Sequence, residues 1–209
     1  MSELKRYSTS EEFINSFTHA IGALLSIYGM VMLAASSQNP LEASSTAIFG
    51  ATLFILFQSS TLYHAMVNET AKRVFRKIDH SAIFMLIAGT YTPILLLVMP
   101  FPHSIAIMAM IWYLAISGII YSCITLKFKY LSTGLYLLMG WLSVFLCYRI
   151  WVTASHQVVW LLLAGGVIYS IGSLFYLSKK KYMHSIWHVF VILGAVMHYF
   201  AIMELLQSR

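Results

Sequence analysis

Long runs of apolar residues, separated by short polar segments, dominate the pattern of this chain. Seven such runs are visible, at 19–36, 45–66, 80–99, 104–124, 130–148, 157–177 and 184–206. An α-helix needs roughly 20 residues to cross the ~30 Å hydrocarbon core of a bilayer, and each run is close to that length. The pattern therefore predicts an all-α integral membrane protein, a seven-transmembrane helix bundle that forms a single domain over residues 1–209.

The first 18 residues are more polar, and we expect them to form a short segment that leads into the first span. Ser8 and Thr9 each precede a glutamate by three residues, which is typical of the capping box at a helix N-terminus. Lys5 and Arg6 are followed by polar residues rather than by an apolar stretch. No cleavable signal peptide is therefore expected.

The composition excludes other classes of protein. Of the 209 residues, 60% are hydrophobic and 10% are charged, whereas a soluble domain carries about 25% charged residues. The formal net charge of +6 does not indicate a nucleic-acid partner, because the cations are divided among separate short loops. The two cysteines, Cys123 and Cys147, do not suggest a disulfide framework.

The lysines and arginines predict the orientation in the membrane, because alternate loops lie on the same side. One set of loops contains eleven of the 13, namely Lys5, Arg6, Lys72, Arg73, Arg76, Lys77, Lys127, Lys129, Lys179, Lys180 and Lys181. The other set contains only Arg149 and Arg209. Cytoplasmic loops carry the excess of positive charge. We therefore predict a cytoplasmic N-terminus, a cytoplasmic segment 1–18 and a C-terminus outside.

Two histidines at the start of the last apolar run are the first candidates for chemistry. His184 and His188 are four residues apart, so they share one helix face and lie roughly 6 Å apart along the axis. This spacing suits two imidazoles that bind one metal ion. An interfacial position facing headgroups or water is the alternative, and the pair alone does not decide between them.

The predicted orientation brings further polar residues to the same depth as this pair. His64 ends the second run near the cytoplasmic face, with Ser60 one turn deeper on the same side of the helix. Asp79 begins the third run at the same level. Three imidazoles, a carboxylate and a hydroxyl from three distant segments are thus predicted to share one membrane depth.

Three neutral imidazoles with an open fourth position are typical of a catalytic zinc site. Zinc lowers the pKa of bound water to about 7. Asp79 would take the proton of this water or orient it, and Ser60 would bond the water or a developing oxyanion. A structural zinc usually has four Cys or His ligands. Neither cysteine is suitably placed for that, which favours the open site with His64, His184 and His188 as ligands.

Three other histidines have weaker interpretations. We expect His19, with Glu12 and Asn15, to cap the cytoplasmic mouth of the bundle. His80 projects about 100° away from Asp79 on the helix and is expected to lie behind the site or at the interface. His198 lies ten residues beyond His188, ~15 Å deeper, and is expected to bond across the bundle with Glu204 or a tyrosine.

The combination of these motifs resembles the progestin and adipoQ receptor family, and within it the bacterial branch known as hemolysin III. The motifs are Ser60-x-x-x-His64, Asp79 at the start of the next helix, His184-x-x-x-His188, Glu12-x-x-Asn15-Ser16-x-Thr18-His19 and Gly89-Thr90-Tyr91-Thr92-Pro93. The resemblance implies seven spans, zinc on the three histidines, and Asp79 and Ser60 beside the metal. It also implies a bacterial cytoplasmic (inner) membrane location and a relation to alkaline ceramidases.

Three functions are compatible with these observations. The first is a zinc-dependent hydrolase of a lipid amide or ester, with membrane lipids as partners and a role in membrane lipid homeostasis. The second is a non-enzymatic lipid sensor or membrane regulator in which zinc only clamps helices together. The third, suggested by the hemolysin name, is a cytolytic pore, which should show polar residues repeated along a lumen-facing stripe. The predicted helices are polar mainly near one end, which ranks the pore last. The sequence does not separate the first two.

Overall fold

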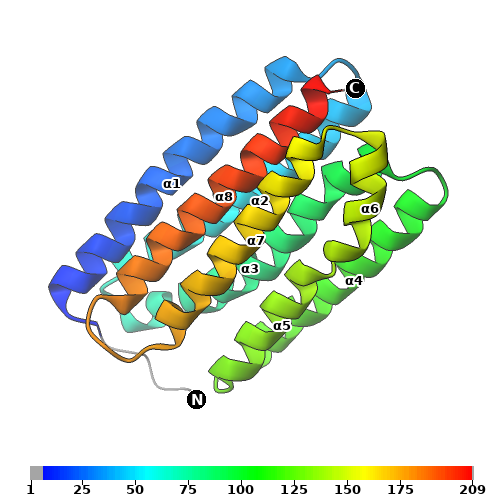
Figure 1. Cartoon of the computed structure of the whole chain (residues 1–209). Helices are drawn as coiled ribbons and strands as arrows, with labels where there is room; N and C mark the ends of the chain where they lie inside the picture. The colour runs from blue at the N-terminus through cyan, green and yellow to red at the C-terminus, as the bar shows by residue number, and fades with distance from the viewer. Residues whose placement is uncertain (1–6, 209) are drawn as a thin grey trace.

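The computed structural model of the protein describes residues 7–208, and the described residues form helices joined by short loops, without a strand (Figure 1). Seven spans are long and apolar enough to cross a membrane, which confirms the predicted seven-helix bundle. The helices are α1 (Thr9–Ser36), α2 (Pro40–Ala65), α3 (Glu69–Val98), α4 (His103–Ile124), α5 (Lys129–Trp141), α6 (Val144–Thr153), α7 (His156–Leu177) and α8 (Met183–Gln207). Segments α5 and α6 together form the fifth span.

Side-chain caps explain where several of these helices begin. Ser8 and Glu11 form the predicted capping box at α1. The side chain of Asn39 accepts hydrogen bonds from two backbone N–H groups of α2, and Pro40 follows at the first helical position. Asn68 caps α3 through the N–H of Ala71, 3.0 Å away. Caps of this kind satisfy backbone donors that have no partner within the helix.

Two spans begin earlier along the chain than the apolar runs alone predict. The first apolar run begins at residue 19, but α1 is continuous from Thr9. The third run begins at residue 80, but α3 starts at Glu69. In both cases a capped, more polar stretch extends the helix beyond its hydrocarbon-facing part, so Glu12 and Asp79 lie inside regular helix and have fixed positions.

The fifth span contains a break that hydropathy does not predict. The run 130–148 suggests one helix, whereas the chain leaves regular helix between Trp141 and Val144. The hydroxyl of Tyr91 on α3 donates to the carbonyls of Met139 and Gly140, each at 3.0 Å. Non-helical backbone at membrane depth requires such internal partners, and Tyr91 supplies one here.

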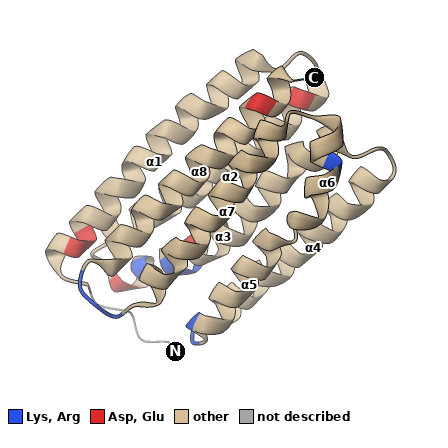
Figure 2. Cartoon of the chain, in the orientation of Figure 1, with Lys and Arg blue, Asp and Glu red and all other residues tan. Residues whose placement is uncertain are grey.

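The packing of the bundle places the ends of α1, α2 and α8 together. Helix α1 packs on α2 and α8, α3 lies between α2 and α4, and α7 packs on α8 (Figure 1). The start of α1, the end of α2 and the start of α8 lie at the same end of the molecule, which we call the metal end (Figure 1). Charged residues gather near the two ends of the bundle, with several lysines and arginines at the metal end (Figure 2).

Candidate metal centre

Three histidines from two helices converge at the metal end. His64 is the penultimate residue of α2, and His184 and His188 lie in the first two turns of α8. The three side chains are buried. The ring centroids of His64 are 5.2 Å from His184 and 5.1 Å from His188, and the other two rings are 4.6 Å apart. The structure thus brings together the three residues expected to bind a metal.

The ligand atoms of these three histidines fit a single metal ion. One nitrogen from each lies within 4.8 Å of the other two. The Nε2 atoms of His184 and His188 are 3.1 Å apart, close to the roughly 3.3 Å that separates two imidazole nitrogens in a tetrahedral zinc site with ~2.0–2.1 Å bonds. Among the described residues, this is the one group of three or more His, Cys, Asp or Glu with such geometry.

Helix α1 contributes none of the three histidines, but it supplies hydrogen-bonding partners that orient two of their rings. Nδ1 of His64 lies 2.6 Å from a carboxylate oxygen of Glu12. Nδ1 of His188 donates to the backbone carbonyl of Asn15 at 3.1 Å, with the Thr18 hydroxyl 3.3 Å away. A proton held on Nδ1 leaves Nε2 as a lone-pair donor. Among the described residues, the buried Nε2 of His64 has no hydrogen-bond partner, which leaves its lone pair available for a metal ion.

Glu12 is itself held by a cation. Nζ of Lys72 on α3 lies 2.7 Å from the second carboxylate oxygen of Glu12. The same ammonium group donates to the carbonyl of Met66 at 3.3 Å, which satisfies the C-terminal end of α2. A partner beyond the ligand commonly sets ring orientation and basicity in metal sites. The series of contacts from Lys72 through Glu12 to His64 therefore links α3, α1 and α2 at the His64 ring.

The two residues expected to act beside the metal occupy different environments. Ser60 lies one turn before His64 on α2 and is 1% exposed, and its hydroxyl has no partner among the described residues. Asp79 on α3 has a side chain 15% exposed, with a carboxylate oxygen 3.5 Å from Nδ1 of His80. Asp79 does not belong to the three-residue metal-binding group. Their catalytic roles stay predictions.

The other three histidines considered lie outside the group that could bind one metal ion. His19 does not cap the mouth but is buried, with its ring stacked on His188 at a centroid distance of 3.6 Å. His80 donates from Nδ1 to the carbonyl of Arg76 at 2.9 Å. His198 donates to the carbonyl of Leu162 at 3.3 Å rather than to Glu204, and its ring packs on Tyr169.

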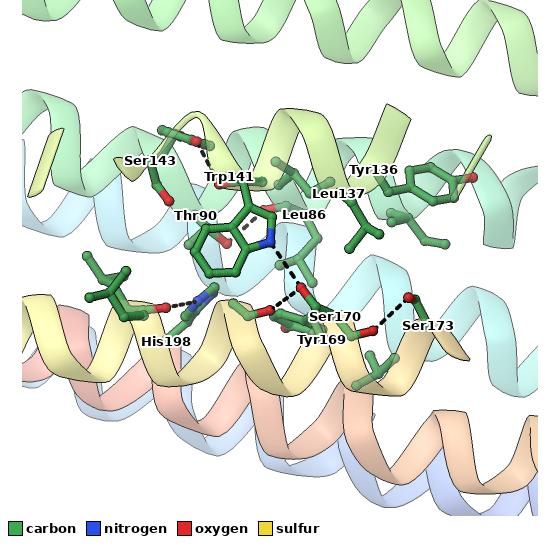
Figure 3. Close-up of a pocket in the computed structure, with 18 of the residues that line it drawn as sticks. Leu86, Thr90, Tyr136, Leu137, Trp141, Ser143, Tyr169, Ser170, Ser173 and His198 are labelled. Carbon is green, nitrogen blue, oxygen red and sulfur yellow. Dashed lines mark hydrogen bonds between the residues drawn. The ribbon is translucent and has the colours of Figure 1, made fainter. Parts of the chain in front are cut away.

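An apolar cavity of about 140 Å³ lies between α3, α5, α6, α7 and α8. At one end it is lined by Trp187, which precedes the candidate ligand His188, and by Tyr176, whose ring centroid is 5.9 Å from His184. His198 lines it farther along α8. Figure 3 shows the indole N–H of Trp141 bonded across it to the hydroxyl of Ser170, at 3.0 Å. The cavity therefore begins near the metal centre and extends into the membrane part of the bundle.

Comparisons with known proteins show the family to which this chain is related. The model of the family described as haemolysin-III related matches residues 7–199. The chain is 39% identical to the hemolysin-3 homolog of Bacillus subtilis, over 94% of this chain and 95% of that protein. It is 38% identical to hemolysin-3 of Bacillus cereus, over 92% and 90%. It is 31% identical to the human monocyte to macrophage differentiation factor, over 94% and 84%.

Proposed function

The chain belongs to the haemolysin-III related family of multi-pass membrane proteins, and on that premise we propose that it is a zinc-dependent hydrolase of a lipid amide or ester. The observation that carries the proposal is the set of three convergent imidazoles, two of them with Nδ1 already hydrogen-bonded outward. Such a set leaves the fourth position of a tetrahedral ion open. Zinc bound there would supply Lewis-acid chemistry for cleaving a carbonyl derivative.

The residues around the three histidines have the chemistry that hydrolysis requires. When water attacks the substrate carbonyl, Asp79 accepts the proton that the water loses and returns it to the departing amine or alcohol. Ser60 donates its unpartnered hydroxyl proton to the oxygen on which negative charge develops. The sum of these steps is the cleavage of one carbonyl–heteroatom bond by one water molecule.

The apolar cavity supports a lipid as the substrate. The surface of its wall is mainly apolar, with Leu86, Ile87 and Leu137 among the lining residues, and it begins beside Tyr176 at the metal centre. An acyl chain in this space would bring its carbonyl toward the three histidines while its tail stayed out of water. A place in the cytoplasmic membrane of a bacterium and a role in membrane lipid homeostasis accord with such a substrate.

A second candidate is a zinc-clamped sensor without catalysis, and one observation favours it. The metal ligands come from α2 and α8 and their hydrogen-bonding partners from α1, so a bound ion would tie three helices together. A pore is disfavoured, because the charged residues that Figure 2 colours lie mainly near the two ends rather than along a stripe through the bundle.

Lipid analysis of membranes tests the hydrolase proposal. Membranes would be incubated with the purified wild type and with a His184→Ala, His188→Ala double variant, and their lipids and free fatty acids compared. We expect the wild type to contain about one zinc per chain and to convert a lipid class that the double variant leaves intact. A double variant with full zinc content would refute the assigned ligands, and equal lipid profiles would favour the sensor.

A further inference from the structure

Tyr7, the residue before the N-cap of α1, packs against the metal centre. Its ring is stacked on His184 at a centroid distance of 5.0 Å and an interplanar angle of 28°. It meets His64 edge-on at 5.6 Å and 63°. These two histidines belong to α8 and α2, so one side chain from a third element contacts a ligand on each.

This contact is not the usual packing of a residue at that position. A residue before the N-cap commonly packs on the fourth helical residue, which forms the hydrophobic staple. Here that fourth residue is Glu12, whose carboxylate is used by His64 and Lys72. Tyr7 instead reaches across to other helices, so local helix capping does not account for its position.

A carboxylate staple fixes the backbone beside Tyr7. One oxygen of Glu11 accepts from the N–H and the hydroxyl of Ser8, at 3.0 and 2.8 Å. The other oxygen accepts from the backbone N–H of Tyr182, at 3.0 Å, immediately before α8. Glu11 therefore ties the start of α1 to the start of α8, the helix that holds His184.

Within the proposed function, we propose that Tyr7 is a positioning residue that covers the metal centre at the metal end and holds the ring of His184. Tyr7 and Tyr176 both pack on this ring, at centroid distances of 5.0 and 5.9 Å, and Tyr176 lines the apolar cavity. Tyr7 thus restricts exchange of the metal and water with the aqueous side, whereas the site stays accessible from the apolar cavity.

The rate at which a chelator removes the metal tests this role in the full-length protein. Zinc-loaded protein in detergent would be mixed with excess EDTA and the remaining zinc followed with time. Removal of the ring in Tyr7→Ala should speed zinc loss by roughly 10-fold or more, the size of effect that supporting residues have on metal sites. Tyr7→Phe keeps the stacked ring and should stay near the wild-type rate. Tyr130→Ala, at an aromatic residue 72% exposed at the start of α5, is the matched control.

A second variant and a spectrum separate positioning from general loss of structure. Glu11→Ala removes the staple without touching a ligand, and we expect faster zinc loss in the same direction as Tyr7→Ala. The visible spectrum of cobalt-loaded protein should change in Tyr7→Ala and be restored in Tyr7→Phe, because it reports ligand geometry. Wild-type rates of zinc loss in both Tyr7→Ala and Glu11→Ala would overturn the role of Tyr7 without contradicting the proposed function. A wild type that binds no metal would instead refute the proposed function.

Discussion

Nδ1 of His64 lies 2.6 Å from the carboxylate of Glu12, a residue 52 positions earlier in the chain and on another helix. This contact joins the first turns of α1 to the end of α2. A carboxylate in contact with the far nitrogen of a metal-binding imidazole fixes the ring and raises its basicity. Glu12 should therefore influence the metal without touching it.

Glu12→Gln tests that relationship. The amide keeps the shape of the carboxylate but loses its charge, so His64 should become a weaker ligand and the affinity for zinc should fall roughly 10- to 100-fold. Competition with a zinc-binding dye measures the change. Glu69→Gln is the control, since this carboxylate is 60% exposed and pairs with Arg73 at the start of α3. Equal losses in both variants would mean that overall charge, rather than the bond to His64, sets the affinity.

Gly165 makes room for His198 between α7 and α8. A Cβ atom at residue 165 would lie 2.3 Å from Cδ2 of His198. Gly165→Ala should therefore lower the thermal midpoint of the detergent-solubilised protein, with an overpacking cost of about 1–3 kcal/mol. Gly134→Ala on α5 is the matched control, because its added methyl would meet nothing within 4 Å. If the two variants have the same thermal midpoint, the close packing of α7 on α8 is not as described.

The predicted orientation is testable at two exposed loop residues. Val67, between α2 and α3, and Phe101, between α3 and α4, are 95% and 81% exposed and lie at opposite ends of α3. In a background with Cys123 and Cys147 replaced by serine, a membrane-impermeant thiol reagent added to intact cells should label Phe101→Cys and not Val67→Cys. Labelling with the reverse preference would place the metal centre on the outer side.

Much of this arrangement could be predicted from local features of the sequence. Hydropathy predicts seven spans. The four-residue spacing of His184 and His188 places both on one helix face, and the orientation given by the loop charges places His64 at the same membrane depth. These features are readable because helix periodicity and the cost of burying charge act on neighbouring residues.

Contacts between distant elements could not be predicted in this way. Tyr7 and Lys72 carry no motif of their own, and they are recognised only by what they contact on other helices. The carbonyl of Met139, just before the break after Trp141, accepts from the hydroxyl of Tyr91 on α3, 48 residues earlier in the chain. The sequence motif that contains His19 with Glu12 and Asn15 is local, but the stacking of His19 on His188 follows from the packing of α1 against α8.

The turnover of a zinc-loaded Asp79→Asn variant tests the central claim most directly. Asparagine keeps the shape of the side chain but cannot accept a proton. If Asp79 is the general base, the variant should keep its zinc and its fold while lipid hydrolysis falls by roughly 10²- to 10⁴-fold. The measurement is the initial rate of fatty-acid release at matched zinc content, with Glu69→Gln as the control. Undiminished release by an Asp79→Asn protein with full zinc would contradict the hydrolase mechanism and leave the metal as a clamp.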